Sequence, residues 1–293
     1  MPFTPSDSLY ASQWYLTRIG DIETIWDSVD GSGVSVAVYD DGVQYTHSDL
    51  NDNYDASQHV VINGSVADPN PVAGAHGTAV AGIIGAELNG EGTVGVAWGS
   101  TLTGVNIFSG AASTGSGFDQ ALSQLDQFDV TNHSWGYPQF FTPISSIDAE
   151  ARLFEDALVT GRDGLGSIHV KAAGNDNSNA NGEHIEASRA TITVGAYDDT
   201  GDASSYSNYG ANLLVSAPSN GGRQGQTTTD LQNGSGYSRG DYTDSFGGTS
   251  GASPVVAGVA ALILDANEDL GWRDVQTIFA YSAHEVGSGV GGT

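Results

Sequence analysis

The chain of 293 residues contains no cysteine, which excludes disulfide bonds. Any stability that the protein needs outside the cell must therefore come from packing, from bound ions or from both. The length is sufficient for one full hydrophobic core, and we expect residues 1–293 to form a single domain.

Basic side chains are also scarce. The chain has 8 Lys and Arg residues against 35 Asp and Glu residues, which gives a formal net charge of −27, and Lys171 is its single lysine. Such a surface repels phosphate backbones and anionic membranes, so we expect neither nucleic acid nor membrane as a partner. The charge fits a heavily solvated protein in salty or calcium-containing surroundings.

Long apolar runs are missing as well. No stretch approaches the roughly 18 apolar residues of a membrane span. Residues 1–8 lack the basic start and apolar core of a secretory signal. The sequence therefore predicts no membrane anchor and no secretory signal in this chain.

A glycine-rich turn followed by a helix of small and apolar residues occupies residues 246–264, with Ser250 at the junction. The first backbone N–H groups of a helix are free, so they can stabilise the oxyanion that a serine nucleophile at this position would create. Serine and threonine are also ordinary N-terminal caps, so a purely structural turn is the alternative. A base and an orienting acid elsewhere in the chain would decide for catalysis.

An acid and an imidazole precede Ser250 in a defined order. The apolar run Val34–Tyr39 predicts a buried strand that ends at Asp40, and His76 stands just before a helix rich in small residues. The order Asp, His, Ser is one of the arrangements of a catalytic triad. Asn175 follows another predicted strand, and its side-chain amide can complete an oxyanion hole.

These motifs together resemble the subtilisin-like serine proteases, and the doubled Asp40-Asp41 resembles the kexin and furin branch of that family. The resemblance extends from about residue 7 to about residue 284. It rests on five ordered motifs, which are Asp40-Asp-Gly42, His76-Gly-Thr78, Ser134-Trp-Gly136, Ala173-Gly-Asn175 and Gly248-Thr-Ser-Gly-Ala-Ser-Pro254.

The resemblance and the chemistry give the motif residues their roles. Asp40 would orient His76, and His76 would move the proton between Ser250 and the leaving amine. Asn175 and the backbone N–H of Ser250 would bind the oxyanion. His47 is the alternative base, but the resemblance makes it a loop residue. The residues expected to bind substrate are Asp41, Ser134, Trp135, Gly136, Asp148, Ala173 and Gly174.

The resemblance also implies a calcium site. Calcium takes six to eight oxygen ligands, in which carboxylates are mixed with carbonyls. Because Asp is abundant in the chain, a chance match is the alternative. The expected ligands are the side chains of Asp7, Asp49 and Asn89 and the carbonyls of Ala86, Glu91 and Thr93.

Convertases that demand paired basic residues line their subsites with carboxylates, because a desolvated cation needs an opposite charge. Asp41 and Asp148 match such positions, whereas Leu122 stands where an acid is expected. Residues 136–144 contain no acid, and Glu183 or Glu186 would have to reach the primary pocket instead. We therefore expect at most a relaxed preference for basic residues, with tolerance for apolar or aromatic ones.

Strand and helix patterns alternate along the chain, which predicts an α/β protein with a mostly parallel central sheet and helices on both faces. The resemblance implies the subtilisin-like three-layer fold. Two polar runs, 176–182 and 219–244, are predicted to be surface loops. The predicted strands are 34–39, 102–108, 130–133, 168–173, 191–196 and 213–217. The predicted helices are 22–28, 77–85, 118–128, 146–160, 250–266 and 272–281.

The expected function is that of a secreted, calcium-dependent serine endopeptidase that acts as a monomer on peptides or proteins. A catalytically weak subtilisin-like module that binds peptides, and an esterase or amidase with the same triad, are the alternatives. The resemblance implies that a propeptide was removed and that a C-terminal companion region is missing. We therefore expect a fragment of a longer protein, for which a propeptide or a chaperone is a further partner.

Overall fold

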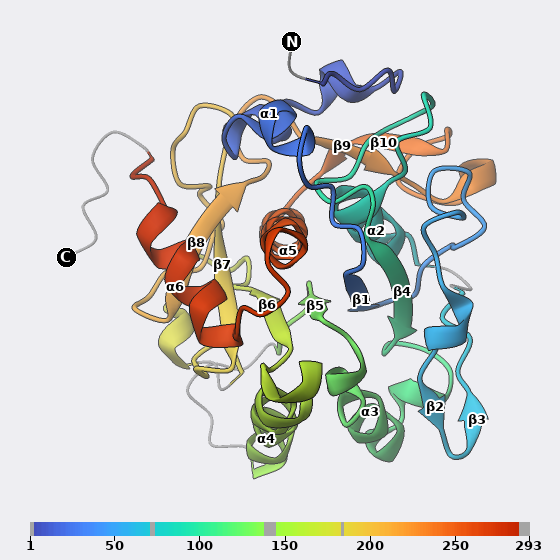
Figure 1. The fold of residues 1–293 in the computed structure, drawn as a ribbon, viewed down its shortest axis with the longest axis vertical. Coiled ribbons are helices and arrows are strands. Elements are labelled where there is room, and N and C mark those ends of the chain that lie inside the picture. Colours follow the sequence, from blue (N-terminus) through green and yellow to red (C-terminus); the bar gives the residue numbers. More distant parts are fainter. Residues whose placement is uncertain (1–2, 71–73, 138–144, 183–184, 287–293) are drawn as a thin grey trace.

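A six-stranded sheet forms the centre of the computed structural model, which describes residues 3–70, 74–137, 145–182 and 185–286. In the helix that begins at Ser145, side chains are described from residue 149 onward. The strand order is β4-β1-β5-β6-β7-β8, every neighbouring pair is parallel, and the order can be followed from β4 to β8 across Figure 1. The strands are β1 (Ser35–Asp40), β4 (Thr101–Asn106), β5 (Val130–His133), β6 (Ile168–Ala172), β7 (Thr191–Tyr197) and β8 (Leu213–Pro218).

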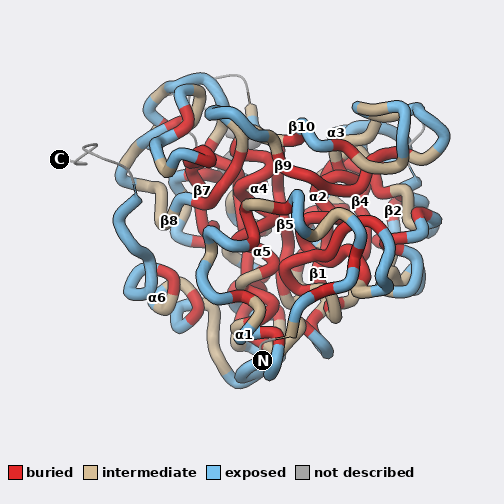
Figure 2. Tube along the Cα trace, turned by 90° about the horizontal axis from the view of Figure 1, so that it is seen from above, coloured by how far each residue is buried: buried red, intermediate tan, exposed pale blue. Residues whose placement is uncertain are grey.

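Helices cover both faces of this sheet, so the predicted fold class is confirmed. On one face lie α2 (His76–Gly85) and α5 (Thr249–Ala266), and on the other lie α3 (Gly115–Leu122) and α4 (Ser145–Thr160). The short α1 (Ile22–Trp26) precedes the sheet, and α6 (Trp272–Ser282) packs beside β8. The resulting three layers bury the strands β1, β4, β5, β6 and β7 almost completely, whereas the edge strand β8 is mostly half-buried (Figure 2).

The sequence of β1 explains why both faces are covered. Val36 and Val38 belong to the hydrophobic cluster under α2 and α5, whereas Ala37 and Tyr39 belong to the cluster under α3 and α4. Successive strand residues point to opposite faces, so a strand that is apolar at every position requires a layer on each side.

Helix α5 crosses the middle of the molecule. Contrary to the expectation that no stretch approaches the length of a membrane span, α5 is long and apolar enough for one by length and composition, but 78% of that window is buried inside the protein. Small residues permit this burial: a Cβ at Gly258 would lie 2.5 Å from Val96 Cβ, too close for any side chain. Helix α5 is thus the core helix of the fold, as Figure 1 shows.

The sequence placed the six sheet strands and the six helices close to their observed positions, but two predictions were wrong. The run 219–244 is not only a loop, because it contains β9 (Gln226–Thr229) and the start of β10 (Tyr242–Phe246), which pair antiparallel. The predicted helix 118–128 ends at Leu122 and is followed by a short 3-10 turn, Leu125–Gln127. A further two-stranded ribbon is formed by β2 (Val61–Ile62) and β3 (Ser65–Val66).

Candidate active site

Asp40 and His76, at the end of β1 and the start of α2, form a direct hydrogen bond. His76 Nδ1 lies 2.8 Å from Asp40 Oδ1, and the backbone N–H of Asp41 donates to the same oxygen (2.8 Å). Asp40 is 1% exposed, whereas the His76 side chain keeps 28% of its surface exposed. The buried carboxylate therefore fixes the imidazole through Nδ1 and leaves Nε2 available for a reaction partner.

Asp41 contacts the beginning of α2. Its carboxylate accepts hydrogen bonds from the backbone N–H groups of His76 (3.2 Å) and Gly77 (2.7 Å). Burial lowers the pKa of His76, but the charge and hydrogen bond of Asp40 and the charge of Asp41 outweigh that effect, so the pKa lies above its ordinary value of 6.5. The sequence predicted Asp41 as a substrate-binding residue, and the structure places its carboxylate on the backbone that carries His76.

Ser250 is the second residue of α5 and is 8% exposed. Its hydroxyl donates to the carbonyl of Ser134 (3.2 Å), and the Ser134 hydroxyl donates in return to the carbonyl of Ser250 (3.0 Å). Within the described residues the Ser250 hydroxyl forms no hydrogen bond with His76. Proton transfer to His76 therefore requires rotation of the serine side chain about χ1. The His76 ring packs against Phe246, with ring centroids 5.3 Å apart.

Asn175 is held against the start of α5 by Thr249. Asn175 Oδ1 accepts hydrogen bonds from the backbone N–H (2.8 Å) and the hydroxyl (3.0 Å) of Thr249. The same hydroxyl accepts a hydrogen bond from the N–H of Gly174 (3.0 Å). Because its oxygen is anchored, the amide presents Nδ2 as a donor, and the N–H of Ser250 is a second donor in the first turn of α5. This pair suits the stabilisation of an oxyanion.

Two strand ends flank Ser250 and carry most of the residues predicted to bind substrate. These are Ser134, Trp135 and Gly136 after β5, and Ala173 and Gly174 after β6. The Ala173 N–H donates to Val194, and the carbonyls of Ala173 and Gly174 accept hydrogen bonds from Asn208. The backbone of Ala173 and Gly174, which we call the wall after β6, is thus already hydrogen-bonded within the chain. Gly136, in contrast, is exposed and available to an extended peptide.

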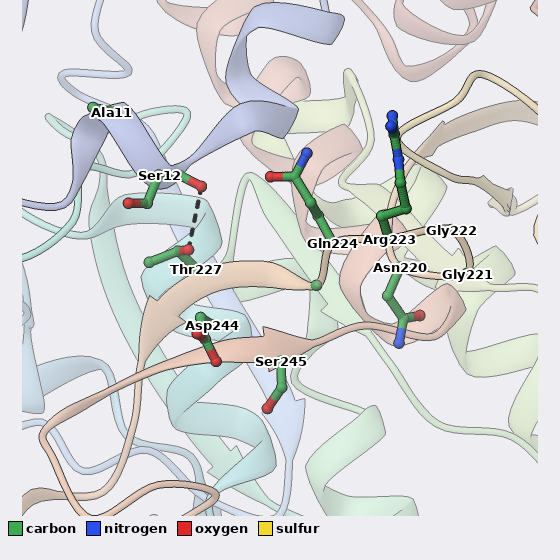
Figure 3. Close-up of a pocket in the computed structure, with 11 residues that line it drawn as sticks. Ala11, Ser12, Asn220, Gly221, Gly222, Arg223, Gln224, Thr227, Asp244 and Ser245 are labelled. Carbon is green, nitrogen blue, oxygen red and sulfur yellow. Dashed lines mark hydrogen bonds between the residues drawn. The ribbon is translucent and has the colours of Figure 1, made fainter.

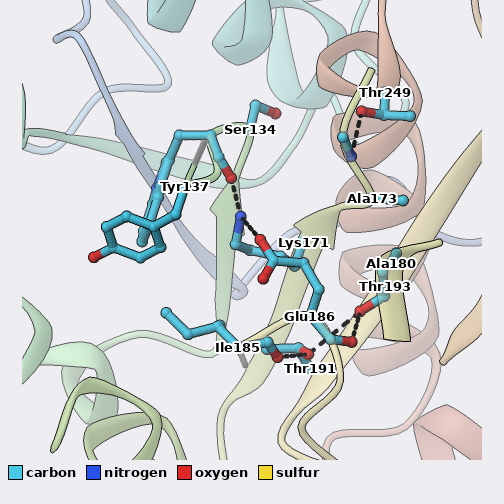
Figure 4. Close-up of polar contacts among 12 residues, drawn as sticks. Ser134, Tyr137, Lys171, Ala173, Ala180, Ile185, Glu186, Thr191, Thr193 and Thr249 are labelled. Carbon is cyan, nitrogen blue, oxygen red and sulfur yellow. Dashed lines mark hydrogen bonds and ion pairs between the residues drawn. The ribbon is translucent and has the colours of Figure 1, made fainter. Parts of the chain in front are cut away.

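Of the acids predicted near the substrate, Asp41 and Glu186 are described, and the carboxylate of each is bonded within the chain. Glu186 is 2% exposed and pairs with Lys171, whose Nζ lies 2.6 Å from Glu186 Oε1 (Figure 4). Leu122, in the place of an expected acid, is completely buried in the core under α3. The side chain of Asp148 and the whole of Glu183 lie outside the described residues.

Comparison with known proteins places this geometry in a family. The sequence model of the subtilase family matches residues 31–291. The chain belongs to the subtilase family. This confirms the resemblance predicted from the five motifs, and with it the expected class of enzyme.

Relatives of this subtilase are proteases. It is 34% identical over 303 residues to proprotein convertase subtilisin/kexin type 7 of Homo sapiens, covering 95% of the chain and 38% of that protein. It is 32% identical over 300 residues to protease KEX1 of Kluyveromyces lactis, covering 97% of the chain and 38% of that protein. The chain therefore spans well under half the length of these curated relatives.

A serine protease of Aeromonas sobria has a similar structure, with a TM-score of 0.85 at 29% sequence identity over 97% of this chain and 59% of that chain. A complex of the Aeromonas sobria protease with a chaperone also matches, with a TM-score of 0.85 at 28% identity over 98% of this chain and 59% of that chain. These solved structures confirm the α/β fold of the subtilase.

The residues of the subtilase expected to bind calcium gather around two buried carboxylates. Asp7 is 4% exposed and Asp49 is completely buried. Asp7 Oδ1 accepts hydrogen bonds from the N–H groups of Asn89 and Gly90 (both 3.1 Å), and Asp49 Oδ2 accepts from the N–H and hydroxyl of Thr93 (both 2.9 Å). Asp7 Oδ2 and Asp49 Oδ1 are buried with no hydrogen-bond partner among the described residues.

This arrangement fits a cation. Burial raises the pKa of Asp49 to about 7, with a smaller contribution from the charges of Asp7 and Glu87. Burial also raises the pKa of Asp7. No group of three or more acidic or imidazole side chains with metal-binding geometry occurs in the described part of the chain. The expected set contains only two carboxylates and relies for the rest on an amide and carbonyls, which is compatible with calcium.

The other expected ligands lie on the loop after α2. Asn89 Oδ1 accepts the N–H of Glu91 (2.8 Å), and the carbonyl of Ala86 accepts the N–H of Gly95 (2.9 Å). Glu87, on the same loop, was not among the ligands predicted from the sequence. It is 7% exposed, accepts the N–H of Asp52 (2.7 Å), and lies close enough to Asp49 to raise its pKa.

A separate surface pocket of about 830 Å³ lies between the N-terminal segment, the loop 220–225 and the strands β9 and β10 (Figure 3). Thr227 Oγ1 donates to the carbonyl of Ser12 at its edge (3.2 Å). No residue predicted to be catalytic lines this pocket. The candidate catalytic residues instead lie at the strand ends and helix starts described above, as is usual for open parallel sheets.

His47, the alternative base predicted from the sequence, lies outside the candidate triad. His47 is completely buried, with Nε2 bonded to the carbonyl of Asp241 (2.9 Å) and Nδ1 to the N–H of Asp49 (3.0 Å). Both ring nitrogens are occupied, and burial lowers its pKa, so its position is structural. Thr249 and Phe246 were missed as positioning residues, although their places beside Ser250 are a signal that could have found them.

Proposed function

We propose that this subtilase domain is a serine endopeptidase that hydrolyses peptide bonds through Asp40, His76 and Ser250. The observation that carries the proposal is the 2.8 Å hydrogen bond between the buried Asp40 and His76. His76 is on helix α2, which packs against α5, the helix whose second residue is Ser250. The anchored amide of Asn175 supports it, because a triad without an oxyanion hole lacks the main electrostatic contribution.

In the acylation step, His76 Nε2 takes the proton of the Ser250 hydroxyl while Oγ attacks the carbonyl carbon of the substrate. The carbonyl oxygen becomes an oxyanion, which Asn175 Nδ2 and the Ser250 N–H bind. Collapse of this intermediate breaks the C–N bond, and His76 gives its proton to the leaving amine. The products are an acyl-enzyme on Ser250 and a free amine.

In the deacylation step, His76 removes a proton from water, and the resulting hydroxide attacks the acyl carbon. The oxyanion forms in the same hole, and His76 returns the proton to Ser250 Oγ as the acid product leaves. The negative charge of Asp40 stabilises the imidazolium in both steps. Since Asp41 adds a second negative charge near His76, this enzyme keeps its histidine protonated to higher pH than an isolated imidazole.

The test is labelling with a fluorophosphonate, followed by assays on peptide and ester substrates. We expect wild-type protein to be labelled and to cleave peptides, and Ser250→Ala to lose labelling and cleavage by several orders of magnitude while keeping its melting temperature. Peptide hydrolysis that survives in folded Ser250→Ala would contradict the triad. Labelling with ester hydrolysis alone would favour an esterase, and peptide binding without labelling would favour a binding module.

We also propose that the domain binds calcium through the side chains of Asp7, Asp49 and Asn89 and the carbonyls of Ala86, Glu91 and Thr93. The carboxylate oxygens of Asp7 and Asp49 that have no hydrogen-bond partner among the described residues support this proposal. The two acids accept hydrogen bonds from the same loop, from donors 82 and 44 residues away in the sequence. Without a cation, the two buried negative charges would repel each other. A calcium ion bound only by the folded state supplies stability by mass action. Glu87 would add negative charge to the same site.

For the setting of the enzyme, we propose a secreted monomer that acts on peptide or protein substrates. The proposed calcium site supports this setting, because a bound ion would stabilise an extracellular protein that has no disulfide bonds. A propeptide or chaperone is a plausible folding partner, since an Aeromonas sobria protease of similar structure forms a complex with a chaperone. The net charge of −27 speaks against nucleic-acid binding.

A further inference from the structure

The single lysine of this acidic chain is completely buried. Lys171 lies in β6 and is 0% exposed, and its Nζ lies 2.6 Å from the carboxylate of Glu186, which is 2% exposed. The same amino group donates to the carbonyl of Trp135 and lies 4.4 Å from the centre of the Trp135 ring. Figure 4 shows the amino group of Lys171 with its ion pair to Glu186. A buried lysine requires such partners, because an unpaired ammonium is too costly to remove from water.

The ion pair adjoins the proposed substrate groove. Lys171 precedes the wall that ends at Gly174, whose N–H is bonded to Thr249 beside the nucleophile. Its other partner, Trp135, directly follows Ser134, which exchanges hydrogen bonds with Ser250. Lys171 therefore connects the segment after β6 with the segment after β5, which form the two walls of the proposed groove. Glu186 contacts Lys171 from the loop before β7.

Two further acids lie near Trp135. Glu150 accepts a hydrogen bond from the hydroxyl of Tyr137 (2.5 Å), and the Tyr137 ring packs edge-on against Trp135 at 5.9 Å. Asp119 is exposed, and its charge acts on both Tyr137 and Glu150. Glu186 is thus neutralised by a lysine and Glu150 is held by a phenol, so neither of these two buried carboxylates is free to meet the charged end of an entering Lys or Arg side chain.

We propose that Lys171 is a specificity-determining residue, which masks the charge of Glu186 and so makes the primary pocket select uncharged side chains. This inference rests on the proposed peptidase function. It concerns P1, the substrate residue whose carbonyl is attacked. A cationic P1 side chain would meet the like charge of Lys171 and a carboxylate that is already paired, so it is disfavoured against an apolar or aromatic one.

A purely structural role for the pair would not predict this. Replacing a buried ion pair by uncharged groups of similar volume is often neutral for stability, whereas removing one partner leaves a charge that needs a new partner. In Lys171→Met, Glu186 becomes a buried carboxylate beside the groove, and a substrate Arg or Lys can supply the missing cation. Only the specificity role therefore predicts a change of preferred P1 residue.

The experiment measures kcat/KM for matched peptides that differ only at P1, with Phe, Leu, Gln, Lys or Arg, at low and high salt. We expect the wild type to prefer Phe or Leu to Arg at both salt concentrations. In Lys171→Met the ratio of kcat/KM for Arg to that for Phe should rise by about tenfold or more, because one desolvated charge pair is gained. The double variant Lys171→Met with Glu186→Gln removes both charges and should keep the wild-type ratio.

Fluorophosphonate labelling counts the active enzyme in each sample and separates loss of folding from change of preference. If Lys171→Met does not fold, Glu186→Gln provides the reciprocal measurement, with peptides carrying Asp or Glu at P1 expected to gain against Phe. A wild-type preference for Arg at high salt, or an unchanged P1 ratio in labelled Lys171→Met, would overturn the inference while leaving the peptidase proposal intact. Wild-type protein that is neither labelled nor active would instead contradict the proposed function.

Discussion

Thr249→Val is the substitution that best tests how the oxyanion hole is built. Thr249 is completely buried, and its hydroxyl donates to Asn175 Oδ1 (3.0 Å) and accepts from the N–H of Gly174 (3.0 Å). Valine has nearly the same shape and removes only the hydroxyl. The backbone N–H of Thr249 still donates to Asn175 Oδ1 (2.8 Å), so the amide keeps one of its two anchors.

The magnitudes follow from these contacts. Leaving the Gly174 N–H without a partner should lower the free energy of unfolding by about 1–3 kcal/mol. Complete loss of one oxyanion donor, as in Asn175→Ala, lowers kcat by about 100-fold to 1000-fold in enzymes of this kind. Because Thr249→Val loosens the amide and does not remove it, we expect a smaller fall in kcat, of about tenfold, with little change in KM.

The assay is steady-state hydrolysis of a chromogenic peptide by Thr249→Val, Asn175→Ala and the double variant, corrected for active sites by titration. If Thr249 acts through Asn175, the double variant should have the kcat of Asn175→Ala, so the two effects are not additive. Thr249→Ser retains the hydroxyl and serves as the matched control, with kcat near that of the wild type. Equal factors for Thr249→Val in both backgrounds would refute the reasoning, because Thr249 would then act independently of the amide.

Two other perturbations test the calcium site and the proton transfer. Chelation should lower the melting temperature, and added calcium should restore it. At a free calcium concentration about 100-fold above Kd, the bound ion should raise the free energy of unfolding by about 2.7 kcal/mol. Asp49→Asn should abolish this response, and a melting temperature indifferent to calcium would argue against the site. Asp41→Asn removes a charge that raises the pKa of His76, so the acid limb of kcat/KM, where His76 becomes protonated and inactive, should move to lower pH. A limb that stays in place, in a variant with unchanged melting temperature, would mean that Asp41 acts only on the helix.

Much of the fold could be predicted because its central strands are apolar at every position. The run that contains β5 was located without error, and the other sheet strands were located within one or two residues. The β9–β10 ribbon could not be found in this way, because its first strand is Gln226-Thr-Thr-Thr229. These side chains are buried through hydrogen bonds, with Thr228 Oγ1 and Thr229 Oγ1 each 2.7 Å from a carbonyl of α2. A polar strand that is buried by its partners has no hydrophobic signature.

The same limit applies to the site. Asp40, His76, Asn175 and Ser250 could be predicted as site residues from local motifs because each stands next to a strand end or a helix start. The roles of Asp41 and Glu186 depend on which donor or cation lies opposite, and those partners come from other parts of the sequence. Asp41 is bonded to the first N–H groups of α2, and Glu186 is bonded to Lys171. An acidic residue near a motif is therefore no measure of the charge that a substrate meets.

The position of Ser250 illustrates how the fold and the chemistry depend on one another. The buried, small-residue helix α5 lies against the sheet, and this brings its N-terminus to the carboxyl ends of β5 and β6. The close packing of α5 fixes the helix against the sheet. The polar contacts then define the position of Ser250: Ser253 donates to Asn132 (2.7 Å), Asn132 donates to Ser134 (2.9 Å), and Ser134 donates to the carbonyl of Ser250 (3.0 Å). Each of these side chains is buried, so breaking the chain of bonds would leave donors without partners, and that cost holds Ser250, the proposed nucleophile, in place.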